Sequence, residues 1–184
     1  MAFLVDGALI FLIALWLVLI VSMLLILWGG LTTRVPYVPL PHGAVRELVR
    51  ALSLNPGDRF YDLGSGDGRV VRAVAEAFPG TEATGVEKAP FPFLASRFRL
   101  RRRKIKNAQI VSGDFFDAPL FRATHIYMYL LPKTVQALLP KFERELAPGT
   151  IVVSCDFPFT ARAAERTMNV RGGRYSYTLY FYTF

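Results

Sequence analysis

The hydrophobic pattern divides the chain into an apolar N-terminal segment and a longer segment of short alternating elements. From residue 8 to residue 28 only Ser22 is polar, and at 1.5 Å per residue such a run is long enough to cross the ~30 Å hydrocarbon core of a bilayer. A cleaved signal peptide is the alternative, but it would need basic residues ahead of a shorter core. Residues 1–7 contain no Lys or Arg. We therefore predict an uncleaved transmembrane anchor over residues 1–33 and a second domain over residues 34–184.

Beyond the proline-rich residues 32–41, which should be extended, the apolar residues recur with helical or strand spacing. Short apolar strands that alternate with helices indicate right-handed crossovers and a parallel sheet. A glycine turn between two C-terminal strands indicates a hairpin. Strands are predicted over residues 59–63, 83–86, 109–112, 125–130, 150–154, 168–170 and 175–184, and helices over residues 43–52, 69–78, 89–104 and 133–146.

Residues 61–70 (YDLGSGDGRV) join the first strand to a helix through glycines at alternate positions, Gly64, Gly66 and Gly68. A turn without side chains lets a nucleoside-like ligand lie against the backbone at the carboxyl end of a strand. A dinucleotide fingerprint places glycine at the first, third and sixth positions, but the sixth residue here is Arg69. The pattern resembles motif I of class I S-adenosylmethionine-dependent methyltransferases. That resemblance implies a Rossmann-like α/β fold whose C-terminal hairpin places an antiparallel strand in the sheet.

Acidic residues follow or end the first three strands, where they would meet such a cofactor. Glu87 lies 19 residues after Gly68, where an acid can accept both ribose hydroxyls. The resemblance implies that Asp114 lies near the adenine and Asp62 near the methionine part. Taken singly, each acid could equally be a turn former or a strand-end cap. No metal site is predicted. The predicted binding residues for S-adenosylmethionine are Tyr37, Asp62, Gly64, Ser65, Gly66, Asp67, Gly68, Glu87, Asp114 and Phe115.

Three motifs occur in order along the chain: residues 36–39 (PYVP), residues 62–70, and residues 153–159 (VSCDFPF). Together they resemble the small membrane-anchored protein lysine methyltransferases whose animal members modify the adenine nucleotide translocase and the ATP synthase c-subunit. The resemblance implies methylation of a protein lysine at a membrane. The chain departs from that family at residues 40–42 (LPH), where relatives carry small hydroxyl residues, and at residues 88–90 (KAP), where they carry Asn-Pro.

The acceptor end of the site is predicted around the fourth and fifth strands. Residues 127–132 (YMYLLP) lack the Asn/Asp-Pro-Pro-aromatic motif of enzymes that methylate base amines. A lysine ammonium, with a pKa near ~10.4, must lose its proton before its nitrogen can attack. An aromatic pocket lowers that pKa and can hold the amine by cation–π contact. Tyr129 and Asp156 are the predicted catalytic residues, with Asp156 orienting the amine. Tyr37, Phe157 and Phe159 are further candidates for the pocket, although core packing would equally explain such aromatic residues.

Charge indicates location and partners. All 22 Lys and Arg follow residue 33, so the positive-inside rule places the domain in the cytoplasm and the N-terminus outside. A single cysteine, Cys155, agrees with a reducing compartment. Residues 34–184 carry a net charge of +9, and residues 97–106 hold seven basic side chains, which we expect to contact anionic lipid headgroups.

Other functions remain open at this point. Nucleic acid is the alternative partner of the basic residues, and it would bind with a steep dependence on salt. The alternative activities are those of an RNA or small-molecule methyltransferase. A different class is a membrane-tethered protein that binds S-adenosylmethionine without catalysis. The protein substrate of a lysine methyltransferase could itself be a membrane protein.

Overall fold

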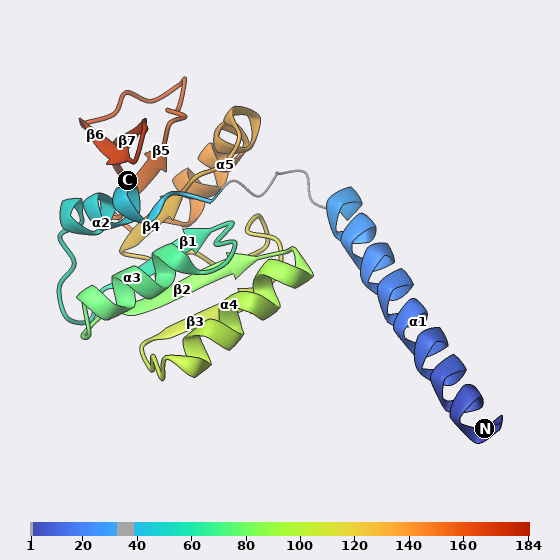
Figure 1. Cartoon of the computed structure of the whole chain (residues 1–184). Coiled ribbons are helices and arrows are strands. Elements are labelled where there is room, and N and C mark those ends of the chain that lie inside the picture. The colour runs from blue at the N-terminus through green and yellow to red at the C-terminus, as the bar shows by residue number, and fades with distance from the viewer. Residues whose placement is uncertain (1, 33–38) are drawn as a thin grey trace. The chain divides into compact units, whose positions relative to one another are not determined.

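The computed structural model describes residues 2–32 and 39–184 (Figure 1), and the side chains of residues 2–6, 8 and 26–32 lie outside this description. The chain divides into two compact units, Met1–Pro36 and Tyr37–Phe184.

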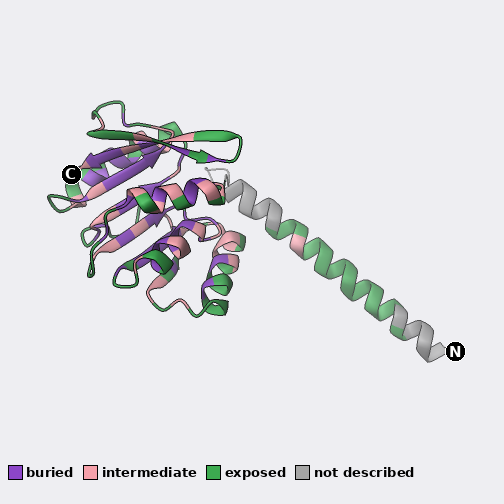
Figure 2. Cartoon of the chain, turned by 60° about the vertical axis from the view of Figure 1, so that its left-hand side comes forward, coloured by how far each residue is buried: buried purple, intermediate pink, exposed green. Residues whose placement is uncertain are grey.

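The first unit contains one long helix, α1 (Ala2–Thr32), as the apolar run predicts. Its large apolar side chains between residues 9 and 25 are exposed (green in Figure 2). Among the residues whose side chains the structure describes, no helix is both long enough and apolar enough to span a membrane. The span predicted for residues 8–28 and the boundary predicted after residue 33 involve residues outside that description, so both stay predictions.

The second unit is built on one seven-stranded sheet with the order β3-β2-β1-β4-β5-β7-β6 (Figure 1). β1 to β5 are parallel, while β7 pairs antiparallel with both β5 and β6. This confirms the predicted parallel sheet with an antiparallel C-terminal hairpin. The strands are β1 (Arg59–Leu63), β2 (Glu82–Glu87), β3 (Ala108–Ser112), β4 (His125–Met128), β5 (Ile151–Cys155), β6 (Arg166–Gly172) and β7 (Tyr175–Thr183). The helices are α2 (His42–Ala51), α3 (Arg69–Ala77), α4 (Pro90–Arg102) and α5 (Pro132–Glu145).

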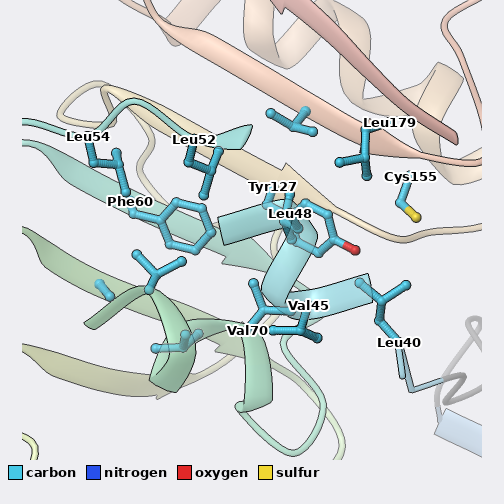
Figure 3. Packing of buried hydrophobic residues seen from close by; sticks show 14 of the residues in the cluster. Leu40, Val45, Leu48, Leu52, Leu54, Phe60, Val70, Tyr127, Cys155 and Leu179 are labelled. Atoms are coloured by element: carbon cyan, nitrogen blue, oxygen red, sulfur yellow. The ribbon is translucent and has the colours of Figure 1, made fainter. Parts of the chain in front are cut away.

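Helices cover both faces of the sheet (Figure 1), and most residues of its central strands β1, β4 and β5 are consequently buried. A buried cluster joins α2 and α3 to one face, and Figure 3 shows Leu48, Val70, Phe60 and Tyr127 within it. Neighbouring residues along the strands point to the other face. There, α5 packs through Phe142 against aromatic side chains near β5 and β7.

The predicted bounds of the fourth and sixth strands are wrong by two residues. The fourth strand ends at Met128, two residues before the prediction, because its ladders to both neighbours end there and Pro132 begins α5. The sixth strand begins at Arg166 and continues to Gly172, because it pairs with β7 along its whole length. Tyr129 consequently lies in the loop after β4, at the carboxyl edge of the sheet, rather than inside the strand.

Candidate functional site

The glycine turn after β1 adopts backbone conformations that favour glycine. The φ angles of Gly64, Gly66 and Gly68 are +78°, +54° and +72°, in the left-handed region that other residues seldom enter. A Cβ atom on Gly64 would lie 2.9 Å from the Leu130 side chain. The turn is tied to β2 because the N–H groups of Gly64 and Ser65 both donate to the Val86 carbonyl. α3 begins directly after Gly68, so its N–H groups point toward the same edge of the sheet.

Glu87 connects this turn to the next strand. One carboxylate oxygen accepts the N–H of Gly66 at 2.7 Å, and the other accepts the N–H of Ala89 at 2.7 Å. Each oxygen has two lone-pair directions, so the carboxylate is fixed in orientation and can still accept further hydrogen bonds. This geometry fits the predicted contact with two ribose hydroxyls at the end of β2.

Asp62 lies beneath the turn, among polar atoms that lack partners. Its neighbours in the sheet are Gly85 of β2 and Tyr127 of β4, and the hydroxyl of Ser65 lies against Gly85. The Ser65 and Tyr127 hydroxyls are buried and have no hydrogen-bond partner among the described residues. Burial, with the charges of Glu87 and Asp67, raises the pKa of Asp62 well above its ordinary value. Buried polar groups normally have partners, so this cluster suits a ligand that carries a cationic amino group, such as the methionine part of S-adenosylmethionine.

Asp67 makes contacts that differ from the predicted ligand contact. Its carboxylate accepts hydrogen bonds from Arg69 at 2.9 and 3.0 Å and forms an ion pair with Arg99 of α4 at 3.0 Å. Burial opposes its ionisation, but the hydrogen bond from Arg69 and the charges of Arg69 and Arg99 lower its pKa. Arg69 also donates to the carbonyl of Leu40 at 2.8 Å. Asp67 therefore holds the turn against α4 and against the segment that precedes α2.

Asp114 and Phe115 follow β3 at the same edge of the sheet. One oxygen of Asp114 accepts the N–H of Phe116 at 3.0 Å, and the other pairs with Lys88 at 3.1 Å. The Phe115 ring lies 4.0 Å from the position that a Cβ on Gly64 would occupy. An aromatic face and a carboxylate are thus placed beside the glycine turn, where the resemblance puts the adenine.

Three residues predicted for the acceptor end of the site, Tyr129, Asp156 and Phe157, lie close together. Tyr177, which the sequence analysis did not single out, lies beside them. The Tyr129 ring stacks on the Phe157 ring, with 6.4 Å between the ring centroids. It contacts the Tyr177 ring of β7 edge-on, with 6.1 Å between the centroids. Asp156 has a φ of +62°, an uncommon conformation that accumulates at functional sites. It is held there because its N–H donates to the Thr178 carbonyl at 2.7 Å and its Oδ1 accepts the Thr178 N–H at 2.8 Å.

Burial, then the charge and hydrogen bond of Asp156, raise the pKa of Tyr129 above its ordinary value. Tyr129 is therefore a neutral phenol throughout the physiological range, and its hydroxyl lies near the Asp156 carboxylate. The two predicted catalytic side chains form one unit at the carboxyl edge of β4 and β5.

Two other aromatic candidates lie elsewhere or outside the described residues. The prediction that Phe159 lines the pocket is wrong, because its ring is buried on the α5 side of the sheet. Its ring centroid lies 4.8 Å from that of Tyr182 and 6.2 Å from that of Phe142. Tyr37 lies outside the described residues. The sequence also gave no reason to single out Tyr127 or Tyr177. Only the strand register, which sets Tyr127 beside Asp62 and brings β7 against β5, could have identified them.

Comparison with known proteins agrees with this site. The model of the ANTKMT methyltransferase domain matches residues 62–166. A protein-lysine N-methyltransferase of Saccharolobus islandicus is 35% identical over 81% of this chain and 93% of that protein. The lysine N-methyltransferase of the ATP synthase c-subunit from Rattus norvegicus is 33% identical over 67% of this chain. This chain covers 56% of that longer relative.

A solved structure supplies both the fold and the ligand. The RNA methyltransferase from Salinibacter ruber, crystallised with S-adenosyl-L-homocysteine, has a TM-score of 0.73 and 34% sequence identity. The match covers 79% of this chain and 93% of that one. The second unit therefore has the Rossmann-like class I methyltransferase fold, and S-adenosylmethionine is the cofactor.

The position of Glu87 predicts a specific loss of cofactor binding. Glu87→Gln replaces one carboxylate oxygen by an NH₂ group that cannot accept from Gly66 or Ala89. We expect affinity for S-adenosylmethionine to fall at least tenfold, by ~1.4 kcal/mol or more, in calorimetry. Glu82→Gln is the matched control, since Glu82 lies at the other end of β2 and pairs only with Arg59 at the surface. Equal affinities of the two variants would contradict the assignment.

The raised pKa of Asp62 predicts the pH dependence of stability. Between the ordinary carboxyl pKa of 3.8 and the raised value, the folded protein retains a proton that the unfolded chain has lost. Without cofactor, this group therefore lowers stability as pH rises through that window. Asp62→Asn should gain thermal stability relative to the wild type as pH rises above the ordinary carboxyl pKa of 3.8, while binding S-adenosylmethionine more weakly. Parallel pH profiles of melting temperature for the two proteins would contradict a buried, protonated Asp62.

Proposed function

The chain belongs to the family of the ANTKMT methyltransferase domain and is an S-adenosylmethionine-dependent methyltransferase, and we propose that its methyl acceptor is a lysine side chain of a protein. The names of the relatives from Saccharolobus islandicus and Rattus norvegicus support a lysine acceptor. The single observation in the structure that supports it most is the grouping of Tyr129, Phe157, Tyr177 and Asp156.

The aromatic side chains suit an amine that must reach the cofactor without its proton. When bound, S-adenosylmethionine would supply a methyl group on a cationic sulfur. The lone pair of a neutral amine would attack the methyl carbon as the carbon–sulfur bond breaks, with S-adenosylhomocysteine as the leaving group. Tyr129, Phe157 and Tyr177 provide faces along which the lysine methylene chain can pack, and they exclude water. Partial burial disfavours the ammonium form and so lowers its pKa from ~10.4. Because displacement needs alignment more than a chemical base, positioning and loss of water contribute most.

Asp156 is the residue we assign to orient the amine. Thr178 fixes its backbone and one carboxylate oxygen, so the carboxylate cannot rotate away from the pocket. The charge on this carboxylate opposes the effect of the aromatic faces, since it favours the ammonium form. It therefore captures the charged lysine first. The bound lysine then loses one proton to solvent before its nitrogen attacks, and the methylated amine that forms is again a cation. No side chain of the methyltransferase itself needs to change its ionisation state.

Methylation of RNA is the second candidate, because the solved relative from Salinibacter ruber is named an RNA methyltransferase. The basic residues 97–106 would suit such a substrate. The loop after β4 (residues 129–132, YLLP) nevertheless lacks the Asn/Asp-Pro-Pro-aromatic motif expected for exocyclic amines of bases. The aromatic pocket with one carboxylate accommodates an aliphatic amine, and we favour lysine for that reason.

The helix α1 supports a location at a membrane. It is a 31-residue helix whose large apolar side chains are exposed between residues 9 and 25, and all Lys and Arg follow residue 33. We infer a single span with the methyltransferase domain on the cytoplasmic side, near a substrate that is itself a membrane protein or lies at the membrane surface. Anionic lipid headgroups near residues 97–106 complete this arrangement.

The identity of the acceptor can be tested by transfer of labelled methyl groups. Membranes from cells lacking the protein, incubated with full-length protein and radiolabelled S-adenosylmethionine, should yield label in protein and in methylated lysine after hydrolysis. Asp156→Asn should lower the rate about 100-fold through loss of alignment, with unchanged cofactor affinity, because asparagine tolerates a positive φ. Glu143→Gln on the exposed side of α5 is the control. Label that appears in RNA would support the second candidate instead.

The membrane location can be tested with an impermeant thiol reagent. A cysteine introduced at Gly7 should react in intact cells, whereas one introduced at Glu143 should react only after lysis, because the two would lie on opposite sides of the bilayer. The native Cys155 is buried, and burial raises the pKa of its thiol to about 12, so background labelling is low. Reaction of both positions before lysis, or extraction of the protein by alkaline carbonate, would contradict the proposed span.

A further inference from the structure

The outer side of α4 exposes an apolar stripe that the fold leaves uncovered. Phe91, Leu94 and Phe98 are 42%, 60% and 64% exposed, and spacings of three and four residues place them on one side of the helix. Isolated apolar residues on a surface are ordinary, but a group of this kind marks a surface that binds something.

The same helix carries a concentration of positive charge. Arg99 and Arg102 of α4, Arg103 directly after it and Arg72 of α3 line a hollow of about 460 Å³. Two carboxylates offset part of this charge: Asp67 lies 3.0 Å from Arg99, and Glu76 lies 3.6 Å from Arg103. Arg72 and Arg102 have no ion pair within the part of the chain that the structure describes. Guanidinium groups that share one hollow repel each other, and a bound anion removes that repulsion.

Exposed apolar side chains beside basic ones suit the boundary between acyl chains and anionic headgroups, where both kinds of side chain find a favourable environment. We propose that α4 docks on an anionic phospholipid surface, with Phe91, Leu94 and Phe98 against the acyl-chain boundary and the four-arginine hollow around a headgroup phosphate. Nucleic acid would satisfy the arginines, but it offers no apolar environment for Leu94 at the centre of the stripe. A bilayer satisfies both features at once.

Docking through α4 would bring the cofactor site close to the lipid. The helix begins at Pro90, directly after Ala89, whose N–H is bound by Glu87. Arg99 lies at the border of the hollow and also donates to the Asp67 carbonyl in the glycine turn at 3.2 Å. Glu87 and Arg99 therefore connect the docking surface of α4 directly to the cofactor turn. This inference concerns the partner of α4 and does not depend on which acceptor is methylated.

Full-length protein in nanodiscs can test the docking. A nitroxide at Leu94→Cys should gain accessibility to oxygen, relative to a water-soluble nickel relaxant, when phosphatidylcholine is replaced by a mixture with phosphatidylglycerol. A nitroxide at Glu143→Cys is the matched control and should not change, because Glu143 is an exposed residue of α5, on the opposite face of the sheet. A Leu94 nitroxide that stays in water on both disc types, or is immobilised only when RNA is added, would overturn the proposal.

The hollow itself is tested by two double variants with equal changes in net charge. Arg72→Gln with Arg102→Gln should lower the ratio of docked to undocked protein ~30-fold, since each basic residue near an anionic surface contributes ~1 kcal/mol. Lys133→Gln with Arg174→Gln, at exposed positions outside α3 and α4, should change it less than threefold. An equal fall in the docked fraction of both double variants would show that net charge alone attracts the domain to the membrane, and it would overturn the proposed headgroup site. Methyl transfer to a soluble lysine peptide should be unaffected in both double variants, which separates this result from a failure of the proposed activity.

Discussion

The structure depends most on the hydrogen bonds that join the ends of β1 and β2. Val86 accepts from Gly64 and Ser65, and Glu87 accepts from Gly66 and Ala89. These bonds fix the glycine turn against the second strand, and they orient the carboxylate that we expect to contact the ribose. Because α3 starts where the turn ends, the same bonds set the position of that helix, of the buried cluster beneath it and of the cofactor site.

The two halves of the site are built by different means. The cofactor half uses backbone groups at the edge of parallel strands, which is the general position of nucleotide sites in α/β sheets. The acceptor half needs the antiparallel strand β7, because Tyr177 and Thr178 come from it and hold Tyr129 and Asp156 from two other segments. An uncommon backbone conformation at Asp156 is maintained by that contact. In the proposed site, the C-terminal hairpin therefore contributes to the acceptor pocket as much as β4 and β5 do.

Electrostatics connects the cofactor turn to the surface of the domain. Asp67 neutralises part of the charge of Arg69 and Arg99, while Arg72 and Arg102 keep theirs. The basic residues of α4 thus serve two purposes: one of them supports the turn, and others are available for a partner. Such a division explains how seven basic residues in ten can be accommodated beside a cofactor that is itself cationic at sulfur.

The sequence alone determined the order and type of the elements, the glycine turn and the position of Glu87 at the end of a strand, because these follow from local periodicity and from where strands end. The roles expected of Asp62 and Asp114 came from the resemblance to class I methyltransferases. It could not separate Phe157, which lies in the acceptor pocket, from Phe159, which is buried under α5. It also gave no sign of Tyr127, Tyr177 or the four-arginine hollow. Those depend on strand register and on which helix faces meet, and residues far apart in the chain acquire a common environment only when the sheet is assembled.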